Sequence, residues 1–236
     1  MTIEEKVFLK SGFDPEKMRD FGFVKTGAGY SYTADFMDGD FRAEILVTKD
    51  GSVCGRVVDT MNDEEYAPLR AADFDGPFVS TVRAAYEALL QHVAENCCVE
   101  KPFVSAQANR ITGMIFGRWG VRPDFPWGDS PYDGAGVFRH LRSGKWFALI
   151  MRIKRLNLLK NGDETPLDAV NLKIDPGALP SPTEKDGIFP AYHMNHKHWI
   201  TVVLDDTLSD DAVMALLESS FSLTETKKDR IERPET

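Results

Sequence analysis

A short stretch in the last quarter of the chain concentrates side chains that can bind ligands. Within residues 187–204, six consecutive positions hold His193, Met194, Asn195, His196, Lys197 and His198. The run at 200–204, Ile-Thr-Val-Val-Leu, is apolar and rich in β-branched residues, which predicts a buried or half-buried strand. We expect this strand to be well anchored and to hold a dense group of hydrogen-bond donors at one of its ends.

The spacing of the histidines, His-x-x-His-x-His, resembles that of ligands for zinc or another ion that prefers imidazole. Strand alternation places His193 on the face opposite its two neighbours, while His196 and His198 fall in or beside a turn. No HExxH motif, glycine-rich phosphate loop or GxSxG elbow accompanies them. We therefore expect no metal, no cofactor and no enzymatic activity, with His193 fixing the hairpin and the other two histidines exposed.

A second turn, at Ser143-Gly144 between strands predicted at 137–141 and 146–153, carries its own basic and aromatic residues. Lysine and arginine neutralise phosphates, asparagine and histidine donate to phosphates or base edges, and tryptophan can stack on bases. The two turns together predict contact with nucleic acid. The candidate contact residues are Arg139, His140, Arg142, Lys145, Trp146, Arg152, Lys154, Arg155, His193, Asn195, His196, Lys197, His198 and Trp199.

The net charge of −9 argues against general affinity for nucleic acid, but the charge is unevenly distributed. Residues 1–100 contain ten basic and nineteen acidic residues, whereas residues 110–160 contain ten basic and only three acidic residues. This asymmetry indicates an anionic partner for the basic segment, or a contact between that segment and the acidic half of the chain.

Two other interpretations of the basic turns stay open. Their cations can be the solvated face of a stable sheet, without any ligand. Alternatively, the chain is a non-enzymatic adaptor that binds a protein partner through an edge strand or through the aromatic loop at 119–132. The acidic first half suits a basic partner of that kind better than it suits DNA.

The composition is that of a globular protein without membrane spans. Of 236 residues, 42% are hydrophobic and 11% aromatic, enough for one large or two small cores. No apolar run approaches the ~20 residues that span a bilayer, and the acidic start at 1–5 is no secretory signal. Cys54, Cys97 and Cys98 have the spacing neither of a disulfide framework nor of zinc ligands. We expect a soluble, reduced, cytoplasmic protein.

The first hundred residues predict a small α+β unit. Thr2 and Glu5 form a capping-box pattern for a short helix, and Asp14-Pro15 begins a second one. Residues 30–58 alternate between apolar and polar side chains across turns at Asp38-Gly39 and Asp50-Gly51, which predicts a three-stranded antiparallel meander. Apolar spacings of three and four predict a helix from about residue 77 to 97.

A boundary near residues 100–102 separates this unit from a second one. The predicted helices of the second unit span 104–118 and about 212–221, the latter capped by Ser209. Its predicted strands span 137–141, 146–153, 169–174, 189–194 and 199–204. Residues 120–136 form a loop pinned by its aromatic residues, residues 178–186 form a short helix or loop, and residues 225–236 form a solvated or frayed tail.

Several motifs of the second unit resemble those of the MmcQ/YjbR family over residues 102–224. The matching strings are Val137-Phe-Arg-His-Leu with Lys145-Trp-Phe-Ala-Leu-Ile, Val170-Asn-Leu-Lys-Ile-Asp-Pro, Phe189-Pro-Ala-Tyr-His-Met-Asn with Lys197-His-Trp-Ile-Thr, and Leu216 through Ser220-Phe-Ser-Leu-Thr. Residues 1–98 look like the N-terminal extension of longer members of the family.

The resemblance implies a two-layer fold, an antiparallel sheet with helices on one face, related to secretion-chaperone-like folds. It also implies DNA binding, because the two hairpins resemble a pair of wings. It implies no catalytic residue. His196 stands where the family pattern leads us to expect a basic residue, so the tip of one proposed wing lacks a fixed positive charge.

Overall fold

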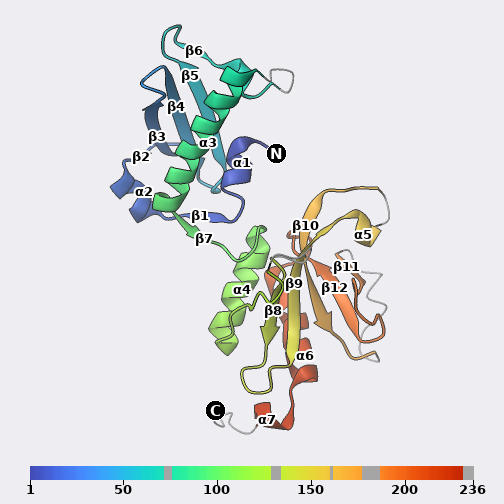
Figure 1. Ribbon diagram of the computed structural model, residues 1–236. Coiled ribbons are helices and arrows are strands. Elements are labelled where there is room, and N and C mark those ends of the chain that lie inside the picture. The colour runs from blue at the N-terminus through green and yellow to red at the C-terminus, as the bar shows by residue number, and fades with distance from the viewer. Residues whose placement is uncertain (72–75, 129–133, 160–161, 177–186, 231–236) are drawn as a thin grey trace. The chain divides into compact units, whose positions relative to one another are not determined.

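Alternating apolar residues build an antiparallel sheet in each of two compact units, residues 1–101 and residues 102–236 (Figure 1). The computed structural model describes residues 1–71, 76–128, 134–159, 162–176 and 187–230. The short helix or loop predicted at 178–186 lies outside the described residues. Among the described residues, no helix is both long and apolar enough to cross a membrane.

The first unit contains a five-stranded antiparallel sheet in the order β2-β3-β4-β5-β6. Its strands are β2 (Val24–Lys25), β3 (Gly29–Phe36), β4 (Phe41–Thr48), β5 (Val53–Asp59) and β6 (Glu64–Glu65). The predicted meander is confirmed as β3, β4 and β5, and two short strands extend it. At the first turn Asp38 and Gly39 both have positive φ, 56° and 92°, as a tight hairpin of this sequence requires.

The helices of the first unit are α1 (Ile3–Val7), α2 (Pro15–Phe21), α3 (Pro77–Cys97) and the 3-10 helix η1 (Ala67–Leu69). The predicted capping box is confirmed, since the Glu5 amide donates to Thr2 Oγ1 at 3.1 Å and the Thr2 amide donates to Glu5 Oε2 at 2.8 Å. α3 packs on one face of the sheet (Figure 1) through a stripe of buried residues. That stripe includes Val82, Tyr86, Leu90 and Val93.

A two-stranded ribbon completes the first unit, with β1 (Ser11–Phe13) paired to β7 (Cys98–Glu100). Cys97, the last residue of α3, and Cys98, the first residue of β7, are both buried. Cys54 differs, because it is exposed on β5. All three thiols are free, and burial raises the pKa of Cys97 to about 11.

The second unit contains a five-stranded antiparallel sheet in the order β11-β12-β10-β9-β8. Its strands are β8 (Gly136–Arg139), β9 (Trp146–Lys154), β10 (Pro166–Lys173), β11 (Ile188–Pro190) and β12 (Trp199–Val203). The strand predicted at 189–194 is wrong in its extent. Pro190 has no N–H to continue the ladder, and the Tyr192 amide donates to Thr201 Oγ1 at 2.8 Å instead of to a backbone carbonyl.

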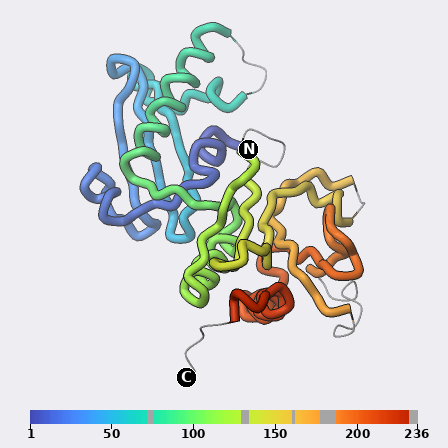
Figure 2. The backbone as a smooth tube through the Cα atoms, turned by 60° about the horizontal axis from the view of Figure 1, so that its bottom comes forward, coloured from blue at the N-terminus to red at the C-terminus, as the bar shows by residue number. Residues whose placement is uncertain are grey.

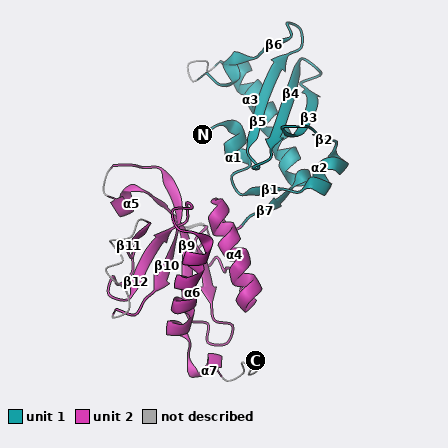
Figure 3. Ribbon diagram, turned by 180° about the vertical axis from the view of Figure 1, so that it is seen from behind, with its two compact units in different colours: residues 1–101 teal, residues 102–236 magenta. Residues whose placement is uncertain are grey.

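Two helices cover one face of this sheet, α4 (Ala106–Trp119) and α6 (Asp210–Thr224). In Figure 3, α6 lies in front of the strands and α4 runs beside it, and Figure 2 views α6 (red) nearly along its axis. Both helices were predicted, with boundaries shifted by a few residues. The fold is therefore the expected two-layer α+β arrangement, and the other face of the sheet carries no helix longer than the four-residue α5 (Leu156–Leu159) among the described residues.

A buried carboxylate ties the start of α4 to the sheet. Asp168 of β10 is 2% exposed, and its Oδ2 accepts hydrogen bonds from the Val104 and Ser105 amides at 3.0 and 2.6 Å. Its Oδ1 accepts from Arg152 Nη1 at 3.0 Å. These bonds satisfy amides that precede the helix and so have no partner within it.

The tail predicted from residue 225 onward begins with ordered structure. The short helix α7 (Lys227–Arg230) follows α6, and Asp229 accepts hydrogen bonds from the Thr226 amide at 2.8 Å and from the Ser143 amide at 3.1 Å. Burial opposes the ionised form of Asp229, but these hydrogen bonds outweigh it and hold the pKa of that carboxyl below its ordinary value. The tail therefore fastens the turn between β8 and β9.

Candidate nucleic-acid interface

The topology brings the two predicted turns to one end of the second sheet. β9 and β12 both pair antiparallel with β10, so they run in the same direction (Figure 1). Leu172 of β10 lies opposite Ala148 on one side and Ile200 on the other. The turn before β9 and the turn before β12 are therefore neighbours, with centres separated by about three strand spacings, roughly 15 Å.

In the first turn only part of the predicted cationic set is available to a ligand. Arg139 Nε pairs with Asp124 Oδ2 at 3.1 Å, and its guanidinium lies 5.1 Å from the Trp146 ring centroid. Arg142 Nη1 donates to the Lys228 carbonyl at 3.3 Å. Lys145 is exposed and forms no ion pair with any described residue. Lys145 is thus the cation that this turn presents most freely.

His140 does not reach the surface, which corrects its place among the candidates. It is 2% exposed, its Nε2 lies 2.8 Å from Thr224 Oγ1, and its ring packs 4.3 Å from that of Phe221. Burial lowers the pKa of His140, although Asp229 and Glu225 partly offset the effect. His140 is a neutral core residue that joins β8 to α6.

Acidifying the protein from about pH 7.5 to about pH 5.5 should destabilise the second unit through His140. A histidine of the unfolded chain titrates near ~6.5, and the folded residue titrates lower, so the unfolded state binds more protons below that pH. The stability that depends on neutral His140 is then fully present above the pKa of histidine in the unfolded chain, and it is lost as the pH falls. Urea unfolding of the second unit should show a smaller pH dependence in His140→Gln than in the control variant His92→Gln, which changes a histidine of α3 in the first unit. An equal pH dependence in both variants would contradict the assignment.

The second turn is held by its asparagine and exposes its other polar residues. The Asn195 carbonyl accepts from the His198 and Trp199 amides, both at 3.0 Å, and its Oδ1 accepts from the Lys197 amide at 2.9 Å. His196, Lys197 and His198 are exposed, as predicted for the two histidines. Asn195 therefore shapes the turn, while the three residues after it face solvent.

The histidine spacing does not produce a recognisable metal site. Within the described part of the chain, no three His, Cys, Asp or Glu side chains are grouped so that they could hold an ion. His193 adopts a left-handed backbone with φ of 57°, and its ring lies 4.0 Å from that of Tyr192. This backbone directs His193 towards Tyr192 rather than along a regular strand.

Three other predicted cations lie at the far end of β9, away from both turns. Arg152 Nη1 pairs with Asp168 at 3.0 Å and Lys154 Nζ with Glu164 at 3.0 Å. Arg155 contacts Asp163 at 3.6 Å and Asp205 at 3.1 Å. The basic character of residues 110–160 is thus largely balanced by acidic residues from later in the chain.

Sequence reasoning missed Lys173, the last residue of β10. It is half-buried, lies between the two turns and forms no ion pair with any described residue. Its amide donates to Ser220 Oγ at 2.8 Å, and Ser220 Oγ in turn donates to the Phe147 carbonyl, so α6 bridges β9 and β10 at this end. The one available signal was its spacing of two from Asn171, which places both on the face away from the helices.

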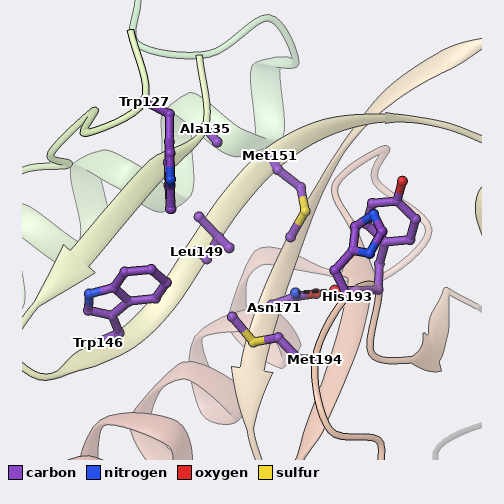
Figure 4. Close-up of a pocket in the computed structure, with 9 residues that line it drawn as sticks. Trp127, Ala135, Trp146, Leu149, Met151, Asn171, His193 and Met194 are labelled. Carbon is purple, nitrogen blue, oxygen red and sulfur yellow. Dashed lines mark hydrogen bonds between the residues drawn. The ribbon is translucent and has the colours of Figure 1, made fainter. Parts of the chain in front are cut away.

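A pocket of about 200 Å³ lies between the two turns on that face (Figure 4). It is lined by Trp127, Ala135, Trp146, Leu149, Met151, Asn171, Tyr192, His193 and Met194. The Trp127 and Trp146 rings meet edge to face at 5.6 Å. Asn171 is fully buried at the base, donates to the Tyr192 carbonyl at 2.8 Å and accepts from Thr201 Oγ1 at 2.5 Å. Nothing in the sequence pattern predicted this pocket, because its lining comes from several separate segments.

The fold and this surface define the second unit as a two-layer α+β domain whose antiparallel sheet has one helix-covered face and one face with an aromatic pocket. The chain belongs to the YjbR family, whose sequence profile matches residues 119–223. A Bacillus subtilis (strain 168) protein described as "Uncharacterized protein YyaQ" is 35% identical over 109 residues, which cover 45% of this chain and 88% of that protein. The resemblance stated from the motifs is confirmed.

Solved structures of proteins from other organisms are similar to about half of this chain. A crystal structure of a Pseudomonas syringae protein is 38% identical and covers 49% of this chain and 97% of that one, with a TM-score of 0.45. A Deinococcus radiodurans protein described as a DUF419 domain is 26% identical and covers 47% of this chain and 75% of that one, with a TM-score of 0.30.

Proposed function

We propose that the chain binds DNA through the end of its second sheet and acts as a binding protein rather than an enzyme. One observation carries the proposal: Lys145, Lys173 and Lys197 lie at one end of neighbouring strands and form no ion pair with described residues. Most other cations of that unit have a carboxylate partner. Cations without a partner are the ones that can neutralise phosphates at little desolvation cost.

The spacing of the two turns supports contact with a phosphate backbone. The turns project from a sheet whose strands are pinned by α6, so the lysines are held at a fixed separation rather than on a flexible tail. The negative first unit opposes non-specific attraction to DNA, because its field has the sign of the phosphates. We propose that residues 1–99 lower the non-specific affinity for DNA, so that binding depends on the contacts made by the two turns.

Protonation of the second turn should strengthen binding. His196 and His198 are exposed beside Lys197, and each gains a positive charge when protonated. Affinity of the full chain for duplex DNA should therefore rise as the pH is lowered from about 8 to about 5.5. Fluorescence anisotropy with a labelled duplex measures this. The rise should be absent in a His196→Gln, His198→Gln double variant, and a wild-type affinity that does not change with pH would remove these histidines from the contact.

A protein partner is the second candidate, and one observation favours it. Leu141 is 76% exposed in the first turn, an unusual place for a large apolar side chain beside cations. Leu141→Ser should leave DNA affinity unchanged if the turn contacts phosphates through Lys145. A loss of DNA binding in that variant would argue that the turn acts through apolar contact instead.

A further inference from the structure

We infer that the pocket between the two turns binds one unpaired nucleobase, so that the chain prefers DNA with an unstacked base to a fully paired duplex. The inference rests on the proposed function, because the turns must first hold the backbone. It adds a ligand class that the cations alone do not specify, since lysines that contact phosphates do not distinguish paired from unpaired DNA.

The walls of the pocket suit a flat, neutral ring. Figure 4 shows Trp127 and Trp146 on one side and His193 with its neighbouring ring on the opposite side. Met151 and Met194 occupy the remaining sides, and methionine adapts its shape to aromatic surfaces. Among the described residues that line the pocket, none is Asp, Glu, Lys or Arg. A base has an uncharged aromatic face, and stacking on aromatic side chains is the common way in which proteins hold single bases.

The volume of the pocket limits the ligand to a small group. At about 200 Å³ it is smaller than the ~300–1,000 Å³ typical of sites for drug-sized ligands. The site is also pre-formed, because Asn171 fixes the backbone of Tyr192 and Asn157 Nδ2 donates to the Tyr192 hydroxyl at 3.1 Å. One ring system therefore fits without rearrangement of the sheet.

The surrounding charge selects a nucleotide over other aromatic ligands. Lys145 immediately precedes the lining residue Trp146, and Lys197 follows the lining residue Met194 by three residues, so each turn carries an exposed cation within three residues of the pocket lining. Lys173 lies two residues from Asn171 on the same face. An aromatic side chain of a protein partner would fill the pocket but would not need these cations. A base attached to a phosphate backbone would use both the aromatic pocket and the lysines.

Three DNA probes test the inference with the full chain: a duplex, the same duplex with one extra unpaired base, and that bulged duplex with an abasic residue in place of the extra base. Anisotropy at low salt should show the bulged duplex binding about tenfold more tightly than either of the others, from stacking of one base. The ratio of the affinity for the bulged probe to the affinity for the abasic probe should approach one in Trp146→Leu and in Met194→Glu. It should stay unchanged in Phe116→Leu, where the lost ring is exposed on α4.

The outcomes separate the two proposals. If all three probes bind equally and with the same salt dependence, the base pocket is wrong and DNA binding by the turns stands. If the preference for the bulged probe persists in both pocket variants, the base binds elsewhere and the inference is overturned. If no probe binds even at low salt, both the inference and the proposed function fail. Trp146→Leu is used only if its melting curve is cooperative. Met194→Glu, at a half-buried position, tests the same effect independently.

Discussion

Replacing both Lys145 and Lys197 with glutamate should lower the affinity of the full chain for duplex DNA about a hundredfold in low salt. Each phosphate contact releases about 0.9 of a counterion, which contributes about tenfold between 1 M and 0.1 M salt. Both lysines are exposed without ion-pair partners among the described residues, so their loss removes attraction without breaking an internal contact. The single variants should each lose about tenfold, since the turns are too far apart to share one phosphate.

Lys154→Glu provides the matched control, because it makes the same change of charge at the far end of β9. Its side chain is 54% exposed and already pairs with Glu164. The affinity of the Lys154→Glu variant for duplex DNA should fall only slightly, because of the change in net charge. An equal loss in Lys154→Glu and Lys145→Glu would mean that overall charge, rather than the two turns, governs binding.

Replacing Asp168 with alanine should destabilise the second unit by about 3–5 kcal/mol, the cost of breaking a buried charged network. Without the Asp168 carboxylate, the Val104 and Ser105 amides lose their hydrogen-bond acceptor. Arg152, 30% exposed, loses its ion-pair partner. The substitution therefore detaches the start of α4 from β10. All four tryptophans lie in residues 102–236, so tryptophan emission during urea unfolding reports this unit alone.

Glu164→Ala is the comparison for this measurement. Glu164 also pairs with a cation, but its side chain is 71% exposed, and exposed ion pairs contribute about 0–1 kcal/mol. A similar small effect in Asp168→Ala would mean that the hydrogen bonds to α4 are replaced by water without cost, which contradicts the role assigned to this carboxylate.

Local patterns in the sequence predicted most of the elements, because each depends on neighbouring residues. The capping box at Thr2 and the cap at Ser209 are examples, since both involve partners three residues away. β11 ended earlier than predicted because Pro190 and the left-handed His193 interrupt the pairing, although the apolar pattern continues past them. Alternation alone therefore overstates a strand that contains such residues.

The charge pattern was less informative than the strand pattern. Ion pairs join residues far apart in the chain, as between Arg110 and Asp210 or between Arg118 and Glu218. A count over residues 110–160 excludes these acidic partners and so overstates the positive charge presented to a ligand. Conversely, Lys173 lies outside that segment and became a candidate only once the strand order was known.

The pocket could not be predicted for a related reason. Trp127, Trp146 and Met194 are each more simply interpreted as packing residues when only the sequence is considered. Their convergence depends on the loop before β8, on the register of β9 and on the turn after β11. Only the two turns carried a recognisable local signal, and the surface between them did not.

The dependence of DNA affinity on salt tests the central claim most directly. For the full chain, the logarithm of the affinity should fall linearly with the logarithm of salt concentration. In the Lys145→Glu, Lys197→Glu variant the slope should be smaller by about 1.8, or about 0.9 for each lost phosphate contact. An unchanged slope in the variant, or no binding by the wild-type chain at low salt, would contradict the account.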